Sequence, residues 1–149
     1  MGATTLSADA WLYGLLANDS ILQAPLAGRV YVDVAPQGAV YPLVIIRCTG
    51  GSDVLGSAGT RVVTRLEYQI TAVRRVDRGV GGFADLQTIA DRVDDLVAGV
   101  AGSIVTVGTR QYAVHGAYRR APLQYTTVES DGTVARHLGG DYVIIVEEL

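Results

Sequence analysis

Hydrophobic and polar residues alternate with a period of two over residues 61–76, which makes this the clearest β-strand of the chain. The even positions are mostly apolar: Val62, Leu66, Tyr68, Ile70, Ala72 and Val76. The odd positions are mostly polar: Arg61, Arg65, Glu67, Gln69, Thr71 and Arg75. Successive side chains of a strand point to opposite faces. We therefore expect the even positions to face the core and the odd ones to face water or a neighbour.

Two segments show the spacing of an amphipathic helix instead. Residues 7–18 place Trp11, Leu12, Leu15 and Leu16 on one face, and Ser7 is a candidate N-cap. Residues 83–97 repeat apolar side chains at helical spacing, and Gly99 is a candidate C-terminal cap. A flexible connection over residues 77–82 is expected to precede this second helix.

Shorter extended segments fill most of the remaining chain. We predict strands at residues 28–34, 41–49, 104–107, 110–120, 123–129, 134–138 and 142–146. The strand at 41–49 is apolar on both faces at its centre and should be interior. Asp131-Gly132 predicts a hairpin turn, residues 35–38 predict a turn, and Gly139-Gly140 allows a bulge or bend.

Residues 50–60 are rich in glycine and serine and predict a long loop, since loops of this length in compact domains are usually functional or disordered. The order of elements favours one α+β domain over residues 1–149. It would contain an antiparallel or mixed sheet, two main helices packed on one face, and a long β-hairpin at the C-terminal end.

The amino-acid composition favours some classes of protein and disfavours others. The chain is 49% hydrophobic and 18% charged, which is typical of a folded domain with apolar surface available for subunit contacts. The net charge of −3 disfavours general nucleic-acid binding. The sequence shows no secretory leader and no apolar run of the roughly 20 residues that span a bilayer, so we expect no membrane association.

Candidate catalytic chemistry is sparse. His115 and His137 are expected to be surface polar residues, and no close pair of ligands is present to begin a zinc site. The single cysteine, Cys48, lies in an apolar strand and is interpreted as a small buried hydrophobe. We therefore predict no catalytic residue, no metal and no cofactor.

Charged and apolar clusters are candidates for subunit contacts. The helix expected at residues 83–97 carries Asp91, Asp94 and Asp95, which are most simply a solvated acidic face. The arginines at 74, 75 and 78 and at 119 and 120 are most simply solubilising. The alternatives are that the acids dock a basic partner, and that the arginines pair with a neighbour's acidic helix or face DNA in a lumen. Val54 and Leu55 are the large apolar groups of the 50–60 loop. The candidate interface residues are Asp53, Val54, Leu55, Arg74, Arg75, Arg78, Asp91, Asp94, Asp95, Arg119 and Arg120.

The chain also resembles a known family. A helix containing Ala10 to Leu16 is followed by Gly28-Arg29-Val30-Tyr31, Ala35-Pro36-Gln37-Gly38 and Tyr41-Pro42-Leu43-Val44-Ile45-Ile46. Then come the long strand ending in residues 68–73, an amphipathic helix and a β-rich end. This order is similar to that of the small tail-terminator, or tail-completion, proteins of siphophages.

The resemblance implies a non-enzymatic virion protein. Members of that family form six-fold rings that cap the tail tube, end its polymerisation and join it to the head-side connector. The implied partners are further copies of this chain, the tail tube protein and a connector or stopper protein, with DNA only passing through the lumen. The implied location is the neck of the virion, after assembly in the bacterial cytoplasm. The alternatives are another connector or stopper component, and a small-ligand-binding domain or enzyme of unrelated class.

Overall fold

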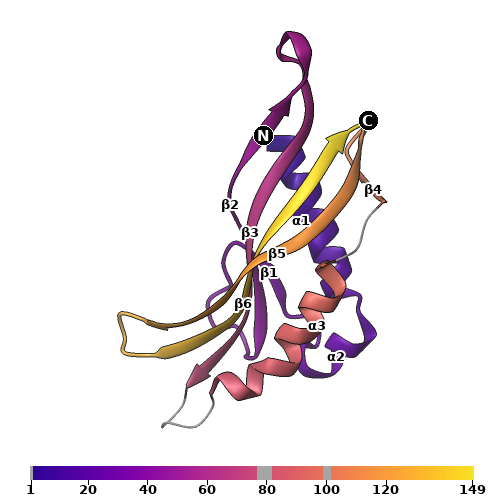
Figure 1. The fold of residues 1–149 in the computed structure, drawn as a ribbon. Helices are drawn as coiled ribbons and strands as arrows, with labels where there is room; N and C mark the ends of the chain where they lie inside the picture. The colour runs from indigo at the N-terminus through magenta and orange to yellow at the C-terminus, as the bar shows by residue number, and fades with distance from the viewer. Residues whose placement is uncertain (1, 77–81, 99–101) are drawn as a thin grey trace.

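The computed structural model describes residues 2–76, 82–98 and 102–149 (Figure 1), with the side chains described from Thr4 onward. The helices are α1 (Gly2–Ala17), α2 (Ser20–Leu26) and α3 (Gln87–Val97), with 3-10 turns at Ser57–Gly59 and Phe83–Leu86. The strands are β1 (Val30–Val32), β2 (Leu43–Leu55), β3 (Arg61–Val76), β4 (Ser103–Val107), β5 (Arg110–Val128) and β6 (Val134–Glu148).

The six strands form one mixed sheet in the order β1-β2-β3-β6-β5-β4. β1 and β2 are parallel, and every other neighbouring pair is antiparallel. The last strand in sequence, β6, is therefore central, where both of its edges are hydrogen-bonded. The general α+β architecture is as predicted.

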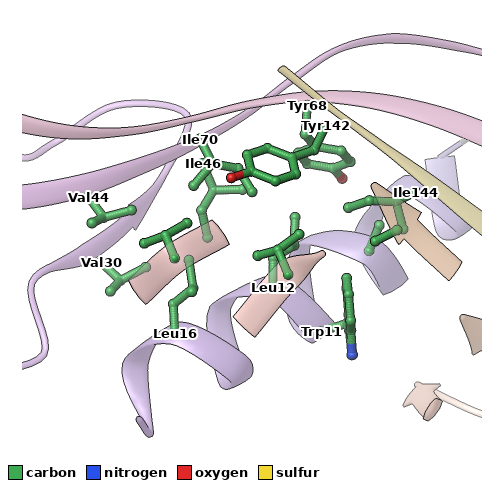
Figure 2. Packing of buried hydrophobic residues seen from close by; sticks show 14 of the residues in the cluster. Trp11, Leu12, Leu16, Val30, Val44, Ile46, Tyr68, Ile70, Tyr142 and Ile144 are labelled. Atoms are coloured by element: carbon green, nitrogen blue, oxygen red, sulfur yellow. The ribbon is translucent and has the colours of Figure 1, made fainter. Parts of the chain in front are cut away.

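The predicted alternation of β3 is confirmed along its middle. Leu66, Tyr68 and Ile70 are fully buried, and they join residues of all three helices in the main core. Figure 2 shows Tyr68 and Tyr142 side by side on the sheet, with Leu12 and Leu16 of α1 beneath them. The helices therefore cover the face to which the even residues of β3 point.

The opposite face of the sheet has a smaller cluster. Leu43, Val73 and Ala135 are buried there, and Ile45 and Tyr41 pack against them. β2 thus has buried side chains on both faces at its start, as predicted for an interior strand. The part of the chain that covers this cluster is the connection between β1 and β2.

Two core tyrosines reach polar groups on the helices. The Tyr68 hydroxyl donates to Asp9 Oδ1 at 2.7 Å, and the Tyr142 hydroxyl donates to Asp94 Oδ1 at 2.8 Å. Burial raises the pKa of each phenol most, and the hydrogen bond to the neighbouring carboxylate raises it further. Both rings therefore stay neutral and act as donors that tie the sheet to α1 and α3.

The N-terminal helix differs from the prediction. α1 begins at Gly2, so Ser7 lies inside it and is not its N-cap; the Ser7 hydroxyl donates to the Thr4 carbonyl at 2.6 Å. The short helix α2 was not predicted. Asp19 caps it by accepting from the Leu22 amide at 3.1 Å. The same carboxylate accepts two hydrogen bonds from Arg92 of α3, at 2.8 and 3.0 Å.

The prediction of a loop over residues 50–60 is wrong for its first half. β2 continues to Leu55 and pairs with β3 from Gly50↔Glu67 to Leu55↔Arg61. The glycines are tolerated because the neighbouring strand satisfies their backbone groups. Only residues 56–60 form a turn, in which Ala58 and Gly59 have positive φ.

Other strand boundaries also differ from the prediction. The strand predicted at 28–34 is only three residues long, because Gly28 and Asp33 have positive φ, at 78° and 71°. The two strands predicted within 110–129 are one strand, and the two within 134–146 are one strand. The register of β5 with β6 shifts between Val114 and Gly116 and between Arg119 and Ala121, and that of β2 with β3 shifts between Cys48 and Gly50 and between Val54 and Leu55.

Gly139-Gly140, which we expected to allow a bulge or bend, has no bulge. The register with β3 runs without a break through Thr71↔Gly139 and Ile70↔Gly140. These glycines instead allow close approach, since a Cβ at Gly139 would overlap the Ile70 carbonyl. The hairpin predicted at Asp131-Gly132 is confirmed, with Gly132 at φ 84°. The helix predicted from residue 83 is also present, whereas its candidate cap Gly99 and residues 77–81 lie outside the described residues.

Candidate assembly surfaces

The end of the β2–β3 hairpin carries three of the predicted interface residues. We call residues 53–62 the hairpin tip; Figure 1 shows it projecting beyond the rest of the sheet. Val54 is 48% exposed and Leu55 is 61% exposed, and Val62 on the facing strand is 51% exposed. Asp53 accepts a hydrogen bond from the Thr64 hydroxyl at 2.7 Å. The tip is therefore ordered by strand pairing but leaves apolar side chains uncovered in the subunit.

Two of the predicted arginines, Arg74 and Arg75, have partners within the same chain. Arg74 Nε is 3.6 Å from Asp85, and the Arg75 guanidinium lies 5.1 Å from the centroid of the Tyr41 ring. Both pairs are partly exposed, so each contributes at most about 1 kcal/mol to the stability of the fold. Arg78 lies outside the described residues.

A second group joins β5 to the acidic helix. Arg119 Nε is 3.8 Å from Asp94, the carboxylate that also accepts from Tyr142. Arg120 is 2.7 Å from Glu67 of β3 and 4.0 Å from Asp141 of β6. Strand pairing across β3, β6 and β5 brings these charges together, and sequence spacing alone does not show it.

The other two acids of α3 have local neighbours. Asp91 accepts a hydrogen bond from Gln87, one turn earlier, at 2.7 Å, and Asp95 lies close enough to Arg92 to raise the pKa of its guanidinium further. The Asp19 hydrogen bonds are the larger cause of that rise. The acidic surface of α3 is thus partly neutralised within the subunit.

A cavity of about 340 Å³ lies on the face of the sheet opposite the helices, and the sequence did not predict it. The β1–β2 connection forms one wall, strands β2, β3 and β6 form the floor, and the far half of β5 forms the other wall. We call this cavity the slot. Its lining residues are Val34, Ala35, Tyr41, Ile45, Arg47, Gln69, Thr71, Val73, Tyr125, Thr127, Glu129, Ala135 and His137.

His137 was expected at the surface, and that prediction is wrong: its side chain is only 9% exposed. Its ring stacks on Tyr125 at a centroid distance of 4.4 Å, and its Nε2 lies 3.0 Å from the Thr127 hydroxyl. Burial, followed by the charge of Arg47, lowers the pKa of this imidazole. Tyr125 and His137 are directly opposed residues of β5 and β6, which the hairpin turn could have indicated.

The remaining candidate ligand and nucleophile residues lie apart from one another. His115 lies on the surface beside Glu147, and Cys48 is partly buried against the core. Among the residues that the structure describes, no three His, Cys, Asp or Glu side chains lie together as metal ligands would. Within those same ranges, no helix has both the length and the apolarity needed to cross a membrane.

Comparison with known proteins identifies the family. The sequence model described as Tail completion protein gp17 matches residues 10–130, which run from the second half of α1 to just past the end of β5. The chain belongs to this tail completion family. The family consists of structural phage tail proteins, so this member is not an enzyme. A search of curated proteins finds no match.

A solved structure supports the fold of this tail completion protein. A chain from the virion of a native gene transfer agent particle superimposes with a TM-score of 0.70 at 19% sequence identity. The match covers 97% of this chain and 98% of the other. The predicted resemblance to tail-completion proteins is thus confirmed, and the chain is a structural component of a phage-like tail.

Proposed function

We propose that this chain caps the completed tail tube, ends its polymerisation and joins the tail to the head-side connector. The observation that carries the proposal is the match to the tail completion family over residues 10–130. We further propose that the chain acts as a ring, most simply a hexamer, in the neck of the particle. DNA would only pass through its lumen, and assembly would take place in the host bacterial cytoplasm.

The edges of the sheet are consistent with a ring. β1 covers β2 only over Val44–Ile46, and β4 covers β5 only over Arg110–Val114. Among the described residues, the rest of each outer edge has no strand beside it. Exposed strand edges can pair with other chains, and a closed ring is one arrangement that covers them without open-ended growth.

The proposal is tested by producing particles without this chain and measuring tail length by electron microscopy. Capping predicts tails of irregular, often excessive length that are not joined to heads. Supplying the wild-type chain should restore uniform, joined tails. Tails of normal length that fail only to attach to heads would instead support a connector or stopper role, and normal particles would refute both.

The ring is tested separately in the intact particle. A reconstruction of the neck should show this chain in rotational symmetry, with six copies under the proposal. A single copy, or no symmetry, would contradict it.

A further inference from the structure

The hairpin tip gathers three exposed apolar side chains on a narrow two-stranded ribbon. Val54 and Leu55 at the end of β2 and Val62 on the facing strand are each about half exposed or more. The pairing of β2 with β3 shifts register between Val54 and Leu55, so these side chains do not follow one regular strand face. A narrow ribbon of this kind buries most of its apolar surface when it is inserted between the walls of a hollow.

The slot offers such walls on the same molecule. Val34 and Tyr41 lie on the side of the β1–β2 connection, and Tyr125 lies on the side of β5. His137 lines the slot, and its Nδ1 is buried without a hydrogen-bond partner in the described part of the chain. An unpaired buried nitrogen costs free energy, and a polar group entering the slot could satisfy it.

The tip cannot reach the slot of its own chain. Ile45 lines the slot and Leu55 lies in the tip, ten positions further along the same strand. An extended strand rises about 3.3 Å per residue, so the two sites are roughly 33 Å apart. Figure 1 shows the tip at the opposite end of β2 from the β1–β2 connection.

We propose that the tip of one subunit inserts into the slot of the next copy of this chain. Two different surfaces of the same molecule would then meet, which is the head-to-tail contact from which closed rings are built. The inference rests on the proposed ring and names the contact that would close it.

Charges near the two sites are complementary. The tip carries Asp53, whose partner in the subunit is the neutral hydroxyl of Thr64, whereas Arg61 of the tip is already paired with Glu148 of β6 at 3.0 Å. The slot carries Glu129 and Arg47, and the nearest acid to Arg47 is the exposed Asp33 at 3.7 Å. A docked tip can therefore place the Asp53 carboxylate near the Arg47 guanidinium. Unfavourable like-charge contacts would select against other orientations.

Cross-linking tests the contact directly. Val54→Cys places a thiol on the tip, and Val34→Cys places one in the slot; both positions are exposed, so folding should be unaffected. Cys48 is replaced by alanine in every variant to remove the native thiol. A flexible bis-maleimide is added to the concentrated protein and to assembled particles, and products are separated under denaturing conditions.

The contact predicts a ladder of covalent oligomers that extends beyond the dimer and stops at the size of the ring. The matched control combines Val54→Cys with Ile104→Cys, which is 63% exposed on β4, and should give no ladder. Glu129→Cys provides a second slot position and should repeat the result of Val34→Cys.

Three outcomes would overturn the inference: dimers only, which indicate a two-fold contact; attachment of the tip to a different virion protein; or an equal ladder in the control. If the neck reconstruction shows a ring but the ladder is absent, the proposed ring stands and this contact is wrong. If tail length is normal without the chain, capping fails whatever the ladder shows.

Discussion

Gly139→Ala is expected to be among the most damaging single-methyl additions in this protein. Gly139 lies in β6, the strand paired on both sides, directly opposite Thr71 of β3. An added Cβ would overlap the Ile70 carbonyl oxygen and lie 2.9 Å from both the Ile70 carbonyl carbon and the Thr71 Cα. These neighbours are backbone atoms of a paired strand, so no side-chain rotation relieves the clash.

The cost follows from moving the strands apart. Ordinary contacts with a Cβ begin at 3.4 Å, so β3 and β6 must separate by more than an ångström at this point to clear the Ile70 carbonyl oxygen. Overpacking of this kind costs about 1–3 kcal/mol. One stretched or broken ladder hydrogen bond adds about 1–3 kcal/mol when its groups stay buried. We expect the free energy of unfolding to fall by roughly 2–6 kcal/mol, or Tm to fall by the order of 10 °C.

Thermal and urea unfolding measure this loss, and two other glycines are matched controls. Gly116→Ala meets no atom within 4 Å and should change stability by no more than about 0.5 kcal/mol. Gly140→Ala should be intermediate, because its closest contact is the Arg119 side chain, which can move. Equal unfolding temperatures for Gly139→Ala and Gly116→Ala would refute the close approach of β3 and β6.

Three further predictions concern the core, the helix cap and the tip. Leu66→Asp should abolish folding, because a buried unpaired carboxylate costs several kcal/mol and the total stability of a domain is roughly 5–15 kcal/mol. Glu67→Ala on the other face should have a mild effect. Similar circular-dichroism melting curves for the two variants would show that the buried face is misassigned. Arg92 is the largest cause that lowers the pKa of Asp19, so this carboxylate stabilises the fold above the usual aspartate pKa and loses that effect as pH falls through its depressed value. Asp19→Asn keeps a capping acceptor but should show a smaller loss of stability in acid than the wild type, and parallel pH profiles would contradict this. Leu55→Asp should leave the unfolding temperature unchanged because the side chain is 61% exposed, yet it should impair assembly; normal particles would remove any role for the tip.

The sequence by itself was sufficient where the signal is local. The alternation along residues 61–76, the helical spacing from Leu86 to Val97 and the Asp131-Gly132 turn each predicted an element that is present. In each case the periodicity of side chains or the chemistry of a turn depends only on neighbours in the chain. The family likeness was also readable, because the order of strands and turns from Gly28 to Ile46 is a local pattern.

Tertiary structure decided the features that depend on distant partners. Residues 50–55 have the composition of a loop but form a strand, because β3 lies alongside and satisfies their backbone groups. His137 is buried because β5 places Tyr125 against its ring, and the slot exists because β6 lies between β3 and β5. Gly139 is needed not for a bulge but for the approach of two strands nearly 70 residues apart in sequence. The order of the strands in the sheet decides which residues become neighbours, and the local sequence pattern does not specify that order.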